Sequence, residues 1–245
     1  MQVLEIHNLS RRFGGLTAVS ELDLKIGRGE IFGLIGPNGA GKTTVLDMIG
    51  GTLFPDSGNI VYDNEDITKY PSHLRARRGI ARVFQRNVLF QSFMVMENVL
   101  AGCHLHSGRG SNEKGLDKEV MDILHFVGLA RQAEEMAVNL PHGKQRALCL
   151  AIALATQAEL FLLDEPLTGM SGEETESMMH MIKTLRDERE ITVVVVEHNM
   201  RAVIGLCDRV AVLNYGKKIA EGLPGNVVEN PTVVEAFLGV EENAF

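Results

Sequence analysis

The sequence predicts an α/β fold built on a parallel sheet, and three stretches carry that prediction. The apolar run Ile31–Ile35 is typical of a buried strand, and a glycine-rich loop and the helical stretch Val45–Ile49 follow it. Two further apolar runs, Leu160–Leu163 and Ile191–Val196, also indicate buried strands, and polar residues follow each of them. Because apolar strands that alternate with helices are typical of covered parallel sheets, we expect one large α/β domain.

Composition and charge limit the classes of protein that this chain can represent. Apolar residues make up 45% of the 245 residues, enough for a substantial core. The formal net charge of −8 weighs against a general nucleic-acid binder, which needs a basic face. The longest apolar run, Ala147–Ala155, is too short to cross a bilayer, and Met1–His7 shows no signal-peptide pattern. The three cysteines have no metal-binding spacing and indicate a reducing compartment, so we expect a soluble, cytoplasmic protein.

The elements on either side of a central insert are expected to form the α/β part of the chain. Before the insert, the predicted elements are strands at Val3–Leu9, Glu21–Ile26, Asn59–Tyr62 and Gly79–Phe84, a helix at Ser72–Arg78 and polar turns at Phe54–Gly58 and Asp63–Asp66. After the insert, they are helices at Glu173–Arg186 and Pro231–Leu238 and strands at Arg209–Leu213 and Lys217–Glu221.

Residues 86–139 differ from the rest because no strand pattern interrupts them. Val95–Ala101 and Leu116–Val127 are predicted helices, joined by the polar linker His106–Asn112. Leu140–Gln145 then begins a further helix that runs to about Thr156, with an N-terminus that suits an anion. We therefore expect a helical insert within the α/β domain.

The loop Gly36–Thr44 connects a predicted strand to a predicted helix, which is the context of a phosphate-binding P-loop. Its glycines allow backbone N–H groups to converge on one concave point, at the positive end of the helix. Lys42 brings a full charge to the β- and γ-phosphates, and the hydroxyl of Thr43 can bind a magnesium ion. The predicted fold class is therefore that of a P-loop NTPase.

Polar residues at the ends of other predicted strands are candidates for the same site. Asp164 and Glu165 follow one apolar strand, where two adjacent carboxylates are costly unless they are paired or bind a metal. His198 follows another, and ligand sites in parallel sheets gather at the carboxyl ends of strands. Gln85 also closes a strand, where a glutamine is more often unremarkable than functional. Phe13 precedes a Gly-Gly turn, where its ring either packs into the core or stacks on a nucleotide base.

Together, and in this order, these motifs resemble the ATPase subunit of ATP-binding-cassette (ABC) transporters over essentially the whole chain. Leu160–Asp164 stands at the Walker B strand, and Thr168–Ser171 takes the place of the D-loop. The nucleotide-binding positions are the adenine-stacking Phe13, the Walker A residues Gly36, Pro37, Asn38, Gly39, Ala40, Gly41, Lys42, Thr43 and Thr44, and the signature-motif residues Pro141, His142, Gly143 and Lys144.

The resemblance implies hydrolysis of the β–γ bond of ATP with Mg²⁺. Thr43, the Q-loop glutamine Gln85 and Asp164 are implied to hold the magnesium. Glu165 stands at the catalytic glutamate, which polarises the attacking water, and His198 at the switch histidine, which positions the γ-phosphate and the water; Gln85 is counted with these two as catalytic. The implied fold is the ABC ATPase fold, one domain over residues 1–245. It has a RecA-like core at about 1–86 and 157–245, a small antiparallel β subdomain, and a helical subdomain at about 87–156.

The resemblance also implies partners. A second ATPase subunit, either a copy of this chain or a paralogue, would pair head to tail with it around two ATPs. Integral membrane permease subunits would hold the pair at the inner face of the cell membrane, and a solute-binding protein would act indirectly; no nucleic acid is implied. Gly79–Gln85, the Pro-His-Gly form of the signature and Val194–Met200 are similar to the branched-chain amino acid uptake subfamily and its urea- and amide-importing relatives.

Five positions depart from the common family pattern and bear on the contact between subunits and on the hydrolysis rate. Pro141 stands in place of the signature serine, His142 of a glycine, Lys144 of a glutamine, Ile152 of an arginine, and Ser171 of an aspartate or asparagine.

Two other classes of protein share these motifs. One is a soluble ABC ATPase of iron–sulfur assembly or DNA maintenance, without a membrane partner. The other is a regulatory nucleotide-binding module without useful turnover.

Overall fold

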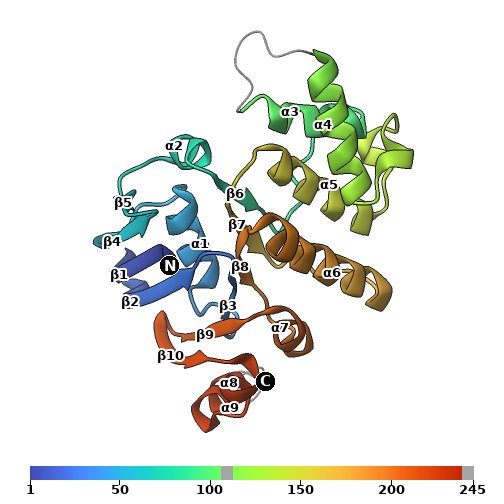
Figure 1. The fold of residues 1–245 in the computed structure, drawn as a ribbon. Helices are drawn as coiled ribbons and strands as arrows, with labels where there is room; N and C mark the ends of the chain where they lie inside the picture. Colours follow the sequence, from blue (N-terminus) through green and yellow to red (C-terminus); the bar gives the residue numbers. More distant parts are fainter. Residues whose placement is uncertain (106–112, 239–245) are drawn as a thin grey trace.

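The computed structural model describes residues 1–105 and 113–238, so the predicted linker His106–Asn112 lies outside the described residues. Two sheets and the helices around them make up this part of the chain (Figure 1). The strands are β1 (Gln2–Phe13), β2 (Leu16–Gly27), β3 (Ile31–Ile35), β4 (Ser57–Tyr62), β5 (Glu65–Asp66), β6 (Ile80–Val83), β7 (Leu160–Asp164), β8 (Thr192–Val196), β9 (Arg209–Asn214) and β10 (Lys217–Gly222). The helices are α1 (Lys42–Gly50), α2 (Ser72–Arg77), α3 (Val95–Cys103), α4 (Glu113–Phe126), α5 (His142–Ala155), α6 (Gly172–Arg189), α7 (Met200–Leu206), α8 (Pro224–Val228) and α9 (Pro231–Leu238), with 3₁₀ turns η1 (Ala130–Gln132) and η2 (Ala137–Asn139).

The larger sheet has the strand order β10-β9-β3-β8-β7-β6. Its neighbours from β9 to β6 pair in parallel, and β10 pairs with β9 antiparallel. The strands β3, β7 and β8 are buried at every position, which confirms the prediction from their apolar sequences. Since these three are neighbours and parallel, the residues that follow them emerge at one edge of the sheet.

The smaller, antiparallel sheet has the order β2-β1-β4-β5, and here the sequence predictions were too short. β1 and β2 continue as one hairpin to the pair Phe13–Leu16, because the two arginines before Phe13 lie at the partly solvent-exposed end of the strand, where polar side chains cost little. The predicted polar turn Asp63–Asp66 was wrong in its second half, where β5 pairs with the end of β4.

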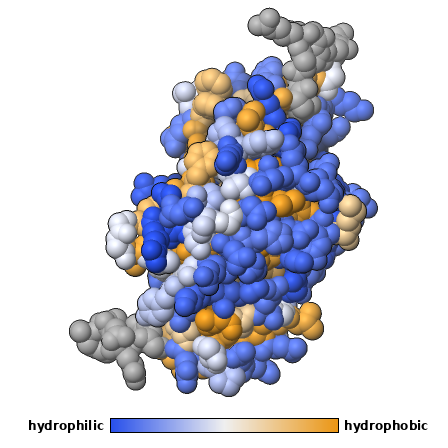
Figure 2. Space-filling view, turned by 90° about the vertical axis from the view of Figure 1, so that its left-hand side faces the viewer, coloured by the Kyte–Doolittle hydropathy of each residue, from blue (hydrophilic) through white to orange (hydrophobic). Residues whose placement is uncertain are grey.

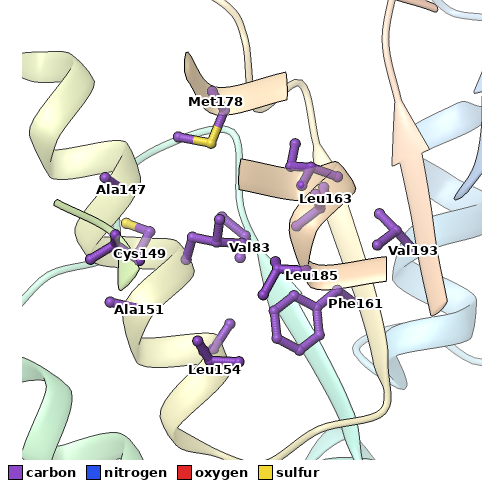
Figure 3. Close-up of a cluster of buried hydrophobic side chains, with 14 of the residues drawn as sticks. Val83, Ala147, Cys149, Ala151, Leu154, Phe161, Leu163, Met178, Leu185 and Val193 are labelled. Carbon is purple, nitrogen blue, oxygen red and sulfur yellow. The ribbon is translucent and has the colours of Figure 1, made fainter. Parts of the chain in front are cut away.

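The described residues between β6 and β7 form helices and turns, with a single β-bridge between Met94 and Met136. Helices α3, α4 and α5 lie together, to one side of the two sheets (Figure 1). One hydrophobic cluster nevertheless runs from these helices into the sheet: Cys149 of α5, Phe161 and Leu163 of β7, and Met178 of α6 converge in it (Figure 3). Helix α5 therefore packs on the sheet through this cluster, and the N-terminus of α5 lies beside the start of α6.

Two short helices were missed from the sequence. Helix α7 begins directly after Asn199, whose side-chain oxygen accepts hydrogen bonds from the N–H groups of Arg201 and Ala202, so the signal was an asparagine N-cap. Helix α8 has Pro224 in its first turn.

The surface shown in Figure 2 is mostly hydrophilic, with scattered apolar patches that include one at its lower end. That end holds α8 and α9, where Leu223, Val234 and Leu238 are exposed. Within the residues described, no helix combines the length and the apolar character that a membrane span requires.

Candidate nucleotide-binding site

A cleft of about 370 Å³ opens at the carboxyl edge of the larger sheet. One wall comes from the β1–β2 hairpin, the floor from the loop between β3 and α1, and the far side from the residue that follows β7. Its lining consists of Phe13, Leu16, Thr17, Ala18, Asn38, Gly39, Ala40, Gly41, Lys42, Thr43, Thr44, Glu165 and Tyr215. The predicted loop, the aromatic residue and one carboxylate therefore share one cavity, although up to about 150 residues separate them in sequence.

The loop after β3 needs glycine at two positions for a steric reason. Gly36 has φ 146° and Gly41 has φ 102°, in the region that disfavours side chains. A Cβ atom at Gly36 would lie 2.1 Å from the carbonyl oxygen of Leu213, and one at Gly41 would lie 2.3 Å from that of Ala18. The loop is thus pressed between the β9–β10 end and the β1–β2 hairpin, and Gly41 is the N-cap of α1, whose positive end faces the cleft.

Lys42, the first residue of α1, is almost fully buried, with 6% of its surface exposed. Its ammonium donates hydrogen bonds to the carbonyl oxygens of Gly36 at 2.7 Å and Pro37 at 2.8 Å. Burial lowers the pKa of Lys42, and the nearby charges of Glu165 and Asp164 oppose this shift. The loop therefore holds a cation at its centre, close to both carboxylates.

Two aromatic rings stand at the open side of the cleft. Phe13 is 46% exposed, and the guanidinium of Arg11 lies 5.1 Å from its ring centroid, so the ring is not packed into the core. Tyr215 is 83% exposed and was not singled out from the sequence, although its place in the Asn214–Gly216 turn between two strands could have drawn attention to it. Each ring offers a flat apolar surface at the mouth of the cleft.

Glu165 is the centre of a polar cluster formed by three predicted strand ends. Its Oε2 accepts hydrogen bonds from Gln85 Nε2 at 2.7 Å and from Thr168 Oγ1 at 3.1 Å. Its other oxygen, Oε1, lies 3.7 Å from Nδ1 of His198. The backbone of Glu165 has φ 46°, an uncommon value for a side-chain-bearing residue, and its N–H donates to the carbonyl of Val196 in β8. The carboxylate is therefore held from two sides and aimed at the cleft.

Asp164 has a different set of partners from its neighbour. It is buried at the end of β7, and Arg82 of β6 donates from Nη2 to its Oδ2 at 3.3 Å. Burial raises the pKa of Asp164, and the charge and hydrogen bond of Arg82 counteract that shift. Arg82 also pairs with Asp47 of α1. Sequence reasoning missed Arg82, because its two partners are distant in the chain.

Glu197, next to His198, is a second missed residue, with only 2% of its surface exposed. Its carboxylate accepts hydrogen bonds from the N–H of Leu167 at 3.0 Å and of His198 at 3.3 Å. Burial raises the pKa of Glu197, while these two hydrogen bonds lower it. Glu197 therefore ties the segment after Glu165 to the end of β8.

The four signature positions, Pro141 to Lys144, lie elsewhere. None of them is among the described residues that line the cleft. Pro141 is the N-cap of α5, and a Cβ atom on Gly143 would lie 2.3 Å from Glu174 Oε1 at the start of α6. His142 lies beside Gly169, in the segment that follows Glu165. The nucleotide-binding residues predicted from the sequence therefore lie on two separate surfaces of this chain.

A second hollow, which we call the apolar groove, runs between β6 and α5. It has a volume of about 320 Å³ and is lined by Ala76, Ile80, Ala81, Arg82, Val83, Phe84, Val88, Phe90, Cys149, Ile152, Ala153 and Thr156. Phe84, Val88 and Phe90 are 39%, 68% and 56% exposed, which leaves three large apolar side chains in contact with solvent just after β6. One of its lining residues, Phe84, directly precedes Gln85 in the sequence.

Comparison with known proteins identifies the family. Residues 19–168 match the ABC transporter family. The high-affinity branched-chain amino acid transport ATP-binding protein BraF of Pseudomonas aeruginosa is 36% identical over 249 residues, covering 97% of this chain and 98% of BraF. The solved structure of MJ1267 in its ADP conformation, an ATP-binding cassette of an ABC transporter, has a TM-score of 0.89 at 28% identity, with coverage of 98% of this chain and 99% of MJ1267. The dimeric structure of the bacterial cassette MJ0796 has a TM-score of 0.81 at 26% identity, covering 90% of this chain and 98% of that one. The chain therefore belongs to the ABC transporter family, in which it is the ATPase subunit.

Proposed function

We propose that this subunit powers the uptake of a small polar solute, most simply a branched-chain amino acid or a related amino acid, amide or urea. The observation that carries the catalytic part is the cluster at Glu165, in which Gln85, Thr168 and His198 surround one carboxylate at the edge of the P-loop cleft. The solute class rests on the similarity to BraF.

ATP enters the cleft with its base toward the aromatic rings and its phosphates toward α1. Phe13 stacks on the adenine, and Tyr215 borders the same opening. The phosphates bind the N–H groups from Gly36 to Thr44 and the ammonium of Lys42. These contacts position the phosphates for attack by water. Positioning matters most here, because phosphoryl transfer to water needs little covalent chemistry from the protein.

Thr43 in the cleft, together with Gln85 and Asp164 next to the cleft residue Glu165, fits a magnesium ion. Mg²⁺ prefers oxygen ligands, and the hydroxyl of Thr43, the amide oxygen of Gln85 and the carboxylate of Asp164 are the oxygen donors that we assign to it, Asp164 through a water. The ion would neutralise charge on the β- and γ-phosphates. Lys42 supplies the second positive charge, and it directly precedes Thr43 at the start of α1.

Glu165 orients and polarises the attacking water. Gln85 and Thr168 occupy one carboxylate oxygen, so the other, Oε1, remains directed toward His198 and the reacting atoms. His198 is 52% exposed and positions both the γ-phosphate and the water. Gln85 thereby connects the water-polarising carboxylate with the metal site.

We propose that the active unit is a head-to-tail pair of cassettes. The signature residues Pro141, His142, Gly143 and Lys144 lie outside the cleft of their own chain, at the N-terminus of α5. A helix N-terminus suits a phosphate, and a second cassette can bring its own to this cleft. The dimeric form of the similar cassette MJ0796 supports this arrangement. The partner is a second copy or a paralogue.

Permease subunits are the proposed membrane partners, and the apolar groove is their proposed docking place. Three exposed apolar side chains beside Gln85 suit an apolar segment of a partner. The subunit then lies on the cytoplasmic face of the cell membrane, and a solute-binding protein acts only indirectly. We divide the chain into a RecA-like core, about 1–86 and 157–245, and a helical subdomain, about 87–156, which places the groove at the boundary between them.

Reconstitution with the permease subunits encoded beside this chain tests the proposal. The complex in vesicles is expected to import leucine, isoleucine or valine with ATP and the cognate solute-binding protein, and not without either. Purification of the chain from its native cells without any integral membrane protein would favour a soluble ABC ATPase instead. Transport of none of the amino acid, amide or urea substrates would contradict the solute class.

A further inference from the structure

Arg82 connects α1 and β7, which carry two of the three proposed magnesium ligands, Thr43 and Asp164, and the function proposed above assigns Arg82 no role. It stands on β6 opposite Leu162 of β7, and 8% of its side chain is exposed. Its guanidinium donates from Nη2 to Asp164 Oδ2 at 3.3 Å and pairs through Nη1 with Asp47. One buried cation therefore connects the end of β7 with α1.

Asp47, the partner of Arg82 on α1, lies on the same helix as Thr43, another of the proposed metal ligands. Asp47 follows Thr43 by four residues, which puts the two on the same face of the helix, one turn apart. Asp47 is itself held, since Thr52 donates from Oγ1 to its Oδ1 at 2.9 Å. Arg82 thus sets the distance between the helix that carries Thr43 and the strand that ends at Asp164.

A third contact fixes the plane of the guanidinium. The ring of Phe84 lies 4.6 Å from the central carbon of Arg82, and Phe84 lines the apolar groove together with Arg82 itself. A planar guanidinium that stacks on a ring and donates in two directions has little rotational freedom. The hydrogen bond from this fixed guanidinium therefore restricts the rotation of the Asp164 carboxylate.

Other arginines in the chain show what a purely structural role looks like. Arg75 is 1% exposed and donates to the carbonyl oxygens of Met48 and Ile49, so it caps the far end of α1 and touches no carboxylate at the site. Arg78 stacks on Tyr70 at 5.0 Å and pairs with Glu65, away from the site. Arg82 has the same kinds of contact as Arg78, but one of its partners is the proposed metal ligand.

We propose that Arg82 is a positioning residue, which holds the carboxylate of Asp164 and the helix carrying Thr43 in the geometry that binds the divalent cation. The proposal rests on the proposed function, because it takes Asp164 as part of the metal site. Release of Asp164 from Arg82 leaves the carboxylate free to rotate, and the cation then binds a less organised set of oxygens.

Manganese(II) binding tests this without any measurement of turnover. The full chain, in excess over a non-hydrolysable ATP analogue, is titrated with Mn²⁺, and the free ion is followed by electron paramagnetic resonance. We expect Arg82→Met to raise the dissociation constant for Mn²⁺ about tenfold, Arg82→Lys to raise it less, and Asp47→Ala to raise it in the same direction. Affinity for the nucleotide in EDTA should stay at the wild-type value, because the loop of residues 36–44 is untouched. Arg78→Met is the matched control and should leave both constants unchanged.

The outcomes separate this proposal from the function on which it rests. If Asp164→Asn binds Mn²⁺ as the wild type does, the metal assignment of Asp164 itself is wrong. If Asp164→Asn weakens Mn²⁺ binding and a folded Arg82→Met does not, or binds the ion more tightly, the positioning role of Arg82 is overturned and the metal site stands. Circular dichroism and thermal melting verify the fold. Should Arg82→Met fail to fold, wild-type Mn²⁺ affinity in folded Asp47→Ala and Arg82→Lys overturns the proposal equally.

Discussion

Lys42 and Glu165 line the same cleft, and single substitutions at these two residues are expected to separate nucleotide binding from hydrolysis. From the sequence, Lys42 was predicted only to bring a charge to the β- and γ-phosphates. Its burial and its two bonds to loop carbonyls show instead that it also holds the loop together.

Lys42→Ala is expected to weaken ATP binding by about 10- to 100-fold, the loss that corresponds to a charge-assisted hydrogen bond of about 1.5–3 kcal/mol. The fold should survive with a lower melting temperature, since the loop loses two hydrogen bonds but no large apolar contact. Nucleotide titration beside thermal melting measures both effects. Lys69→Ala, at an exposed position of the same chain, serves as the control. Unchanged ATP affinity in the folded variant would sink the P-loop assignment.

Glu165→Gln is expected to lower the hydrolysis rate by about 10²–10⁴-fold, because the amide keeps the shape but no longer polarises the water. ATP binding should remain, since no group that cradles the phosphates is altered. Phosphate release and equilibrium binding are the two measurements, and Glu173→Gln, on the exposed first turn of α6, is the matched control. Hydrolysis at the wild-type rate would show that another group activates the water.

At the scale of elements, the strands and the loop were predictable and the cross-connections were not. The apolar runs of β3, β7 and β8 and the glycines before α1 are local features, and each determines its structure within a few residues. Arg82 and Glu197 gain their roles from partners that the fold brings together: Asp47 is 35 residues from Arg82, and Leu167 is 30 from Glu197. The hairpin end at Phe13 was missed because strand pairing with β2, rather than local propensity, extends β1.

The apolar groove between β6 and α5 gives the test at this scale. Val88→Glu places a charge in the groove at a side chain that is 68% exposed, so fold and basal hydrolysis by the isolated subunit should barely change. Transport by the reconstituted complex should fall at least tenfold, because docking of an apolar segment would bury an unpaired charge. Leu223→Glu, at a similarly exposed site on the far end of the molecule, should leave both activities intact. Equal loss of transport in the two variants would assign the groove no docking role.

At the scale of the whole molecule, the proposed pairing of two cassettes predicts ATP-dependent dimerisation. The slowly hydrolysing variant Glu165→Gln should elute from size exclusion as a dimer with ATP and as a monomer without it, at matched protein concentration. The reason is that ATP that is not hydrolysed would hold the two proposed cassettes together. Adding Gly143→Ala should abolish the dimer, because the new Cβ atom clashes with Glu174 and disturbs the N-terminus of α5, which is proposed to face the partner's ATP. The control Gly115→Ala should keep the dimer, because a Cβ atom there meets open space. A variant that binds ATP and stays monomeric would indicate a paralogue as the physiological partner, or a contact weakened at Pro141, Lys144 and Ser171.

The position of His142 beside Gly169 has a consequence for such a pair. In the head-to-tail pair proposed above, the helix end that carries His142 faces the partner's nucleotide. Gly169 directly follows Thr168, which holds the carboxylate of Glu165 at the chain's own cleft. In such a pair, a shift of α5 at one ATP would be transmitted through His142, Gly169 and Thr168 to Glu165, which acts at the other ATP. We therefore expect occupancy of the first site to alter the second, so that the rate of hydrolysis by the proposed pair rises with ATP concentration in a sigmoidal rather than a hyperbolic curve.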